Sequence, residues 1–274
     1  MASAPQAQLP LFYNGLAPLS SQLHPNHGLK PRGDLGFTRG THAIPVTVDE
    51  FPLVQRNYPI VFGVGENPAP LALVGLQEGE NLYLGADDQW EANAYVPAFV
   101  RRYPFMLARL TPDAQELSLC FDDTAGIVVD NEGEKLFAGT DPTETTKAIL
   151  QFCEQFEQAV MRTRGFMEEL TKLDLLMDGE VTIQREGLAQ PAVYRGFRMV
   201  DEQKLQNLRG DQARKMVQSG LMGLIYAHLF SLSLIMVGLG MGCVFPVATT
   251  AVQNAVPRET MGTATAAGIM MRQT

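Results

Sequence analysis

Two adjacent arginines, Arg101 and Arg102, lie within the densest group of aromatic residues in the chain. The aromatic members of this group are Trp90, Tyr95, Phe99, Tyr103 and Phe105. A guanidinium group can stack on an aromatic ring, and it can bind a carboxylate or a phosphate through two parallel hydrogen bonds. The cluster therefore predicts a surface that binds a ligand or a protein or peptide partner, with Arg101, Arg102, Trp90, Tyr95 and Tyr103 as its residues. The alternative is a set of core aromatic residues beside a solvated arginine pair.

The histidines give weaker indications of chemistry. His24 and His27 are spaced as two metal ligands could be, but no third ligand is evident, so we expect no metal site and no cofactor. His42 with Asp49 and Glu50 could form a base and carboxylate pair. A structural histidine at the start of a strand is the favoured interpretation, because nearness in sequence says little about geometry.

The cysteines and paired carboxylates also favour structural roles. Cys120, Cys153 and Cys243 are widely spaced and odd in number, which argues against a disulfide framework or a zinc site. Cys120 lies in an apolar strand pattern without the nearby histidine that a nucleophile needs. The pairs Asp87–Asp88 and Asp122–Asp123 fall in predicted turns, where aspartate bonds the local backbone, although a divalent-ion role stays open. No catalytic residues are assigned, and whether the protein is an enzyme stays open.

Composition limits the class of protein. The 274 residues include 21 Lys and Arg against 30 Asp and Glu, which gives a net charge of −9. An acidic chain of this kind is not expected to bind nucleic acid, because phosphate binding requires clustered positive charge. The N-terminus has neither a basic nor an apolar signal region, so we expect a cytoplasmic core domain.

The pattern of elements predicts an α+β fold with a meandering antiparallel sheet. Short apolar runs between Gly, Pro and Asn residues predict strands, and two pairs of them, on either side of residues 77–80 and of residues 122–126, predict hairpins. The expected strands lie at residues 41–46, 59–64, 71–74, 82–84, 117–121, 127–129, 181–183 and 194–200.

Helices are predicted to pack against this sheet. Residues 96–103 predict a short helix, and a longer one begins with Asp141 as the expected cap and Pro142 in its first turn. Ile149, Phe152, Phe156 and Val160 recur at helical spacing and mark one buried face. A break is expected at Gly165. A polar helix at residues 201–208 should precede a more apolar helix that begins near residue 211.

Several segments, taken together and in order, resemble the bacterial SapC-like family. They are residues 42–46, 50–52, 58–62, 95–105, 119–122, 136–137, 196–202 and 223–229. The resemblance covers about residues 11–233 and implies a link to bacterial surface-layer production. It brings no established catalytic residues, and no apolar span of membrane length occurs in residues 11–218.

The C-terminal tail, residues 234–274, resembles a different family. The Gly- and Thr-rich pattern of residues 237–273 resembles one transmembrane helix, a loop and the start of the next helix of a major facilitator multidrug transporter. The apolar stretch that begins at Leu234 and ends at Val252 is long enough to span a bilayer, which predicts contact with a membrane and an inner-membrane association. Leu221 to Leu234 is instead about the length of a buried helix, and His228 argues against a lipid setting.

We therefore expect an extended N-terminal arm at residues 1–40, a SapC-like α+β domain at 41–233 and an incomplete transporter-like fragment at 234–274. The favoured function is a non-enzymatic accessory or interaction protein of the bacterial envelope or surface-layer pathway. Two alternatives are an enzyme that acts on peptides or amino acids through the aromatic and arginine cluster, and a membrane transporter component, suggested by the tail alone.

Overall fold

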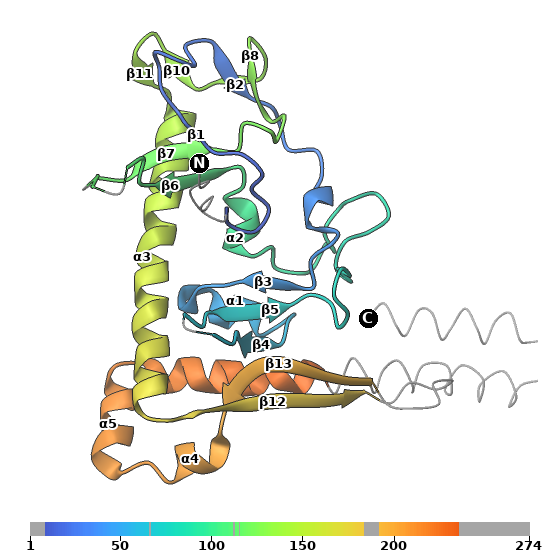
Figure 1. The fold of residues 1–274 in the computed structure, drawn as a ribbon, viewed down its shortest axis with the longest axis vertical. Coiled ribbons are helices and arrows are strands. Elements are labelled where there is room, and N and C mark those ends of the chain that lie inside the picture. The colour runs from blue at the N-terminus through green and yellow to red at the C-terminus, as the bar shows by residue number, and fades with distance from the viewer. Residues whose placement is uncertain (1–8, 66, 112, 115, 184–191, 236–274) are drawn as a thin grey trace, which may run out of the picture.

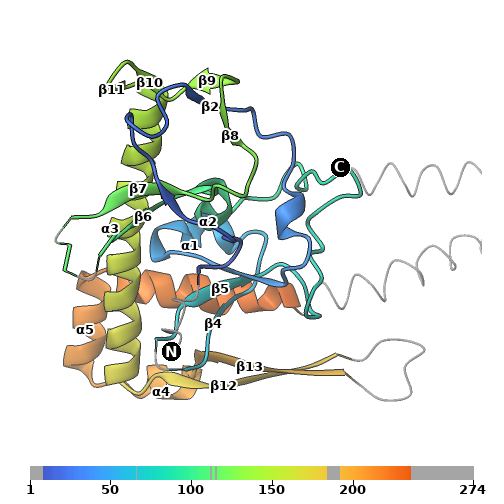
Figure 2. The ribbon, with the colours of Figure 1, turned by 45° about the horizontal axis from the view of Figure 1, so that its top comes forward.

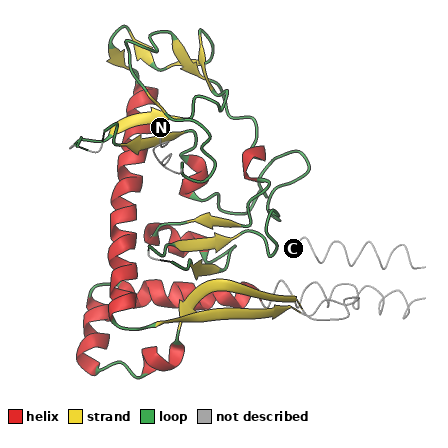
Figure 3. Ribbon diagram, viewed as in Figure 1, coloured by secondary structure: helices red, strands yellow, loops and turns green. Residues whose placement is uncertain are grey.

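The computed structural model describes residues 9–65, 67–111, 113–114, 116–183 and 192–235 (Figure 1). Most of the predicted transporter-like fragment, residues 236–274, lies outside these ranges. The described part mixes helices with antiparallel sheets, which confirms the α+β prediction. Figure 3 shows most strands gathered on one side of a single long helix, α3.

The largest sheet has five strands, and every neighbouring pair is antiparallel. In spatial order they are β12 (Leu176–Ile183), β13 (Ala192–Val200), β4 (Ile60–Phe62), β5 (Pro70–Leu73) and β3 (Ala43–Pro45). The order departs from a simple meander, because β3 pairs with β5 and not with β4. Short helical turns η2 (Val48–Glu50) and α1 (Phe51–Val54) join β3 to β4.

Three small sheets lie toward the N-terminal end of α3, away from the five-stranded sheet (Figure 1). The first contains β1 (Ala17–Pro18), β7 (Ser118–Phe121) and β6 (Phe105–Ala108). The second contains β8 (Val128–Asp130), β2 (His27–Leu29) and β9 (Glu134–Lys135), and the third contains β10 (Phe137–Ala138) and β11 (Asp141–Pro142). The N-terminal segment, residues 9–40, thus supplies a strand to each of two sheets and also contains the turn η1 (Gly36–Thr38).

Two predicted hairpins were wrong. Residues 82–84 form a turn, with a single bridge between Leu84 and Trp90 in place of a strand. Strand β7 pairs with β1 and β6, whereas β8 pairs with β2, so β7 and β8 are not hairpin partners. The reason lies in the turn that joins them, where the Asp122 carboxylate accepts hydrogen bonds from the amides of Asn14 and Gly15 at 2.9 and 3.1 Å. The N-terminal segment is held beside β7 by these bonds.

The long helix α3 (Glu144–Lys172) confirms the predicted apolar spacing but differs in its start and in its continuity. Thr143 is the cap, because its hydroxyl accepts from the Thr146 amide, while Asp141 and Pro142 form β11. The helix also continues through Gly165. One helical glycine costs only about 1 kcal/mol relative to alanine, and burial of Phe166 directly beside it outweighs that cost.

The predicted helix at residues 96–103 is shorter in the structure. It forms α2 (Ala98–Arg101), with Pro97 at the cap position. The C-terminal helices follow the predicted order as α4 (Glu202–Gln206) and α5 (Gly210–Gln218). A further helix, Leu221–Ile235, is bent by 90° from α5 (Figure 2).

No single described helix is long and apolar enough to cross a membrane. The bent pair Gly210–Gln218 and Leu221–Ile235 meets the criterion of length and composition only when its two helices are taken together.

The main core fills the space between the five-stranded sheet, the second half of α3 and the helix Leu221–Ile235. His228 is fully buried in this core, where its Nε2 atom accepts from the Val200 amide at 3.1 Å. Its Nδ1 atom therefore carries the proton and donates to the Ile60 carbonyl at 2.7 Å. One histidine thus ties the C-terminal helix to two strands of the sheet.

Candidate ligand-binding cavity

A cavity of about 950 Å³ opens between the first half of α3 and the N-terminal segment. The end of α2, the start of β6, Ile127 just before β8 and the start of β9 complete its walls. Its lining residues are Leu29, Lys30, Pro31, Arg32, Arg101, Arg102, Tyr103, Pro104, Phe105, Ile127, Gly133, Glu134, Thr145, Ala148, Ile149, Phe152 and Cys153. Its size is that of a pocket for a small organic molecule or a short peptide.

Arg101 lies at the exposed edge of the cavity. Its Nε atom donates to the Val96 carbonyl at 3.1 Å, and its Nη2 atom donates to the Tyr95 hydroxyl at 2.9 Å. The guanidinium also lies over the rings of Tyr95 and Phe152, at 5.5 and 5.3 Å from their centroids. These contacts hold the side chain in place and involve no carboxylate.

Arg102 is buried, with only 6% of its surface exposed. Its guanidinium carbon lies 4.3 Å from the Phe156 ring centroid and 4.6 Å from that of Phe99. Nη1 is 3.6 Å from the Glu157 carboxylate, and Nε has no hydrogen-bond partner. Burial raises the pKa of Glu157, and the nearby Arg102 and Arg164 oppose that shift.

Arg32, which lies in the N-terminal segment, is the third arginine among the lining residues. Its Nη1 atom donates to the Val100 carbonyl at 3.1 Å, and its guanidinium lies 5.7 and 5.9 Å from the ring centroids of Phe37 and Tyr103. Burial lowers the pKa of this guanidinium. Among the described residues it makes no ion pair, so the side chain is partly desolvated without a neutralising carboxylate.

Tyr103 forms part of the cavity wall and of the packing behind it. Its ring stacks on Phe37 at 4.5 Å and meets Tyr13 edge to face at 5.2 Å. Its hydroxyl donates to Asp122 at 3.2 Å. Burial, together with the Asp122 carboxylate, raises the pKa of Tyr103 to about 12, so the phenol is neutral at pH 7 and supplies no charge to the site.

Trp90 and Tyr95, the other two residues of the predicted surface, do not line the cavity. The Trp90 indole donates to the Tyr58 hydroxyl at 2.9 Å, and its ring stacks on Tyr83. The Tyr95 hydroxyl donates to the buried Glu50 carboxylate at 3.1 Å. Tyr95 therefore reaches the site only through its contacts with Arg101, and Trp90 does not reach it.

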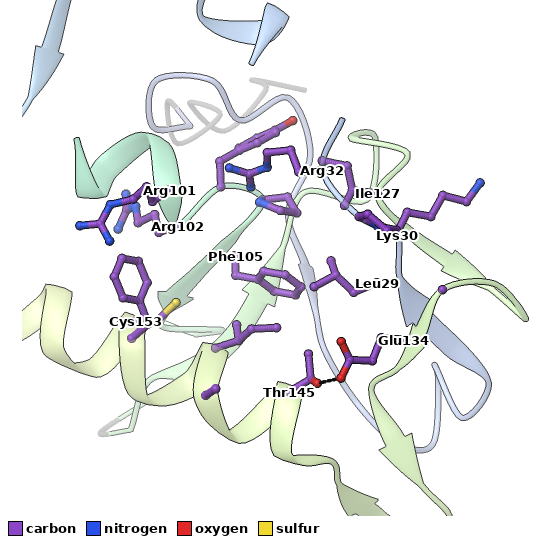
Figure 4. Close-up of a pocket in the computed structure, with 17 residues that line it drawn as sticks. Leu29, Lys30, Arg32, Arg101, Arg102, Phe105, Ile127, Glu134, Thr145 and Cys153 are labelled. Carbon is purple, nitrogen blue, oxygen red and sulfur yellow. Dashed lines mark hydrogen bonds between the residues drawn. The ribbon is translucent and has the colours of Figure 1, made fainter. Parts of the chain in front are cut away.

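The rest of the lining is mostly apolar. Figure 4 shows Phe105 and Leu29 in the middle of the view, with Arg101 and Arg102 on one side and Glu134 on the opposite side. Glu134 accepts a hydrogen bond from the Thr145 hydroxyl at the start of α3. Cys153 also lines the wall, where burial raises the pKa of its thiol to about 11.

Comparison with known proteins identifies the family. The SapC family model matches residues 19–236, which is most of the chain. The chain belongs to the SapC family. The match includes all the walls of the cavity. No curated protein and no solved structure matches the chain. The predicted resemblance of the C-terminal tail to a major facilitator transporter has no support from these comparisons.

The other candidate residues of this SapC-family chain have structural contacts. The His24 and His27 rings meet edge to face at 4.8 Å, and the described residues contain no group of three side chains suited to a metal. Glu50 accepts from the Thr47 and Ala98 amides, and Asp49 pairs with an arginine of α3. These contacts of Glu50 and Asp49 do not involve His42, so they give no support to a base and carboxylate pair.

Cys120 and Asp122 are both buried. Burial raises the pKa of the Cys120 thiol, which suits the predicted core cysteine. Burial alone would raise the pKa of Asp122, but hydrogen bonds from Thr124, Asn14 and Tyr103 outweigh it and lower that pKa. Asp122 thus acts as a charged anchor for the N-terminal segment. Sequence reasoning placed it in a turn but gave no sign of these distant partners.

Proposed function

We propose that this SapC-family protein is a non-enzymatic binding protein whose cavity holds a small molecule or the end of a peptide. A role as an accessory or interaction protein of the bacterial envelope or surface-layer pathway is part of the same proposal. The observation that carries the binding role is the cavity itself, of about 950 Å³, with a mostly apolar lining that includes three arginines.

The chemistry of the lining supports binding more than catalysis. Cys153 is the thiol in the wall, and its raised pKa keeps it protonated at pH 7, whereas a nucleophile needs the thiolate. No histidine lines the cavity among the described residues. The Thr145 hydroxyl donates a hydrogen bond to Glu134, and no histidine among the described lining residues accompanies this pair. The alternative of a peptide- or amino-acid-acting enzyme therefore has less support.

A fluorescence titration of the full chain with 8-anilinonaphthalene-1-sulfonate tests this function. The probe joins an aromatic body to an anionic group, so it should bind one saturable site with increased fluorescence. Ile149→Trp places a bulky ring in the cavity wall and should weaken binding by about tenfold or more, because it removes space that the probe needs.

Leu150→Trp is the matched control. Leu150 is the next residue on α3, is 36% exposed and does not line the cavity, so probe binding should be unchanged. A wild-type protein that binds no probe, or an Ile149→Trp variant that binds it as well as the wild type does, would overturn the proposed binding function.

A further inference from the structure

We infer that the natural ligand of the cavity carries a carboxylate on an apolar body, and that Arg32, Arg101 and Arg102 bind the carboxylate. This inference rests on the proposed binding function and adds the chemical class of the ligand. Two sources share this chemistry, namely a free aliphatic or aromatic acid and the C-terminal end of an apolar peptide.

The lining of the cavity carries more positive than negative side chains. The cavity lining contains four cationic side chains, Lys30, Arg32, Arg101 and Arg102, against the single carboxylate of Glu134. The whole chain has a net charge of −9, so this excess of positive charge is local and opposite to the average. A cavity with low-dielectric walls concentrates such a field and attracts an anion into it.

The arginines of the cavity have N–H donors without acceptors among the described residues. Each guanidinium has five N–H donors. Arg32 has one described acceptor, and Arg101 has two, neither of them a carboxylate. Arg102 is more than nine-tenths buried, and its Nε–H lacks any partner. A buried N–H without an acceptor is costly, and a ligand oxygen would remove that cost.

The cationic side chains of the cavity differ in how closely a carboxylate approaches them. Lys30 is neutralised at 2.7 Å by Glu132, whereas Arg32 and Arg101 form no ion pair among the described residues. Arg102 has Glu157 at 3.6 Å, beyond the ordinary range of a charge-assisted hydrogen bond. Three arginines thus line one space in which Glu157 lies 3.6 Å from Arg102 and Glu134 lies on the side opposite Arg101 and Arg102, and a ligand carboxylate would supply a closer counter-charge.

The apolar part of the lining selects a carboxylate over a phosphate. Phe105, Ile149 and Phe152 offer carbon surface next to the arginines, which suits a ligand that is mostly hydrocarbon. A phosphate monoester carries nearly two charges and three acceptor oxygens, and its larger charge would be repelled by Glu134 on the opposite side. Both groups can bind a guanidinium in a bidentate geometry, but a carboxylate has fewer oxygens and less charge to satisfy beside this carbon surface.

Calorimetric titration of the full chain with matched pairs tests the ligand class. The probes are octanoate against octanamide, and N-acetyl-Ala-Leu-Phe as the free acid against its C-terminal amide. We expect at least one acid to bind about tenfold or more tightly than its neutral partner, because charge-assisted hydrogen bonds are lost in the amide. Preference for octanoate indicates a free acid as the source, and preference for the tripeptide acid indicates a peptide C-terminus.

Arg32→Gln should reduce this preference for the acid, and Arg109→Gln, an exposed arginine outside the cavity, should leave it unchanged. Acids and amides of equal affinity would overturn the inference, as would tighter binding of octyl phosphate than of octanoate. A protein that binds the anilinonaphthalene probe but neither acid would also overturn it and leave the binding function intact. A protein that binds none of these compounds would overturn the binding function itself.

Discussion

The two halves of α3 pack against regions of different character. In the second half, Phe166, Met167 and Leu170 are almost fully buried, and Phe166 meets the rings of Phe51 and Phe62 at 5.8 and 6.1 Å. In the first half, Ile149 and Phe152 are only half-buried and face the cavity.

The two regions also treat polar groups differently. In the main core, both ring nitrogens of His228 have backbone partners, and the Ser231 hydroxyl donates to the His228 carbonyl. Beside the cavity, the Nε–H of the buried Arg102 has none. Buried polar groups in proteins are normally satisfied, so an exception marks a place that requires explanation. Arg198 on β13 of the five-stranded sheet also has a buried Nε atom without a partner, so the clearest difference between the two regions is the open space beside the first half of α3.

The largest expected effect lies in the closed region. His228→Ala removes the partners of the Val200 amide and the Ile60 carbonyl and leaves a void, so the free energy of unfolding should fall by about 3–5 kcal/mol. Urea denaturation of the full chain measures this change. Tyr226→Ala, on an exposed position of the same helix, should cost much less. Equal losses in the two variants would contradict the role of His228.

Acid should weaken the same region. The pKa of His228 is lowered to about 4 by burial, against 6.5 for a free histidine, so the unfolded chain binds a proton between these values that the folded chain does not. Stability is therefore fully present above pH 6.5 and falls as the pH drops toward 4, by about 3 kcal/mol in total. Urea denaturation across this range should show a smaller pH dependence in His228→Gln. If His228→Gln keeps the pH dependence of the wild type, other titrating groups cause the loss of stability at low pH.

The attachment of the N-terminal segment should show an intermediate effect. Asp122→Asn replaces a carboxylate oxygen with an N–H₂ group that faces the donors of Asn14, Gly15 and Thr124, and should lower the free energy of unfolding by about 2 kcal/mol. The neighbouring Asp123 is exposed, so Asp123→Asn should change stability by less than about 0.5 kcal/mol. Limited proteolysis within residues 9–40 should also become faster in Asp122→Asn alone.

The last prediction compares the packing of the two regions directly, through one tryptophan substitution in each. Leu170→Trp forces a larger side chain into close packing and should cost about 1–3 kcal/mol. Ile149→Trp extends into the open cavity and should change stability by less than about 1 kcal/mol. Thermal denaturation of both variants of the full chain provides the measurement. A larger loss for Ile149→Trp would show that the cavity wall is as tightly packed as the core.

Local patterns predicted much of the fold. The spacing of Ile149, Phe152, Phe156 and Val160 identified α3, because helical periodicity depends only on residues three or four apart. Its cap was misassigned because Asp141 and Thr143 can both cap a helix, and the choice depends on the pairing of β11 with β10. The same limit explains the wrong hairpin at residues 122–126, since β1 and β2 pair with β7 and β8, about a hundred residues later.

The candidate site was predicted in part for the same reason. Arg101, Arg102 and Tyr103 are consecutive, so their common location follows from the sequence, and all three line the cavity. Trp90 is near them in the chain but turns toward Tyr58. Arg32 was missed, because nothing in its neighbourhood indicates that residues 29–32 line the same cavity as residues 101–105. The feature that could have drawn attention to Arg32 is its position between Pro31 and Gly33 in the N-terminal segment.

The N-terminal segment also affects the order in which the molecule can fold. The Tyr13 hydroxyl donates to the Phe105 carbonyl, 92 positions away, and the Asn14 amide donates to Asp122, 108 positions away. Closing loops of this length carries an entropic cost that only later contacts offset, and chains with many such contacts fold slowly. On the ribosome, residues 9–40 must wait until β7 and the first half of α3 have been synthesised. The walls of the cavity are therefore complete in sequence once Cys153 has been made, whereas the main core also needs β13 and the helix Leu221–Ile235, which are synthesised later.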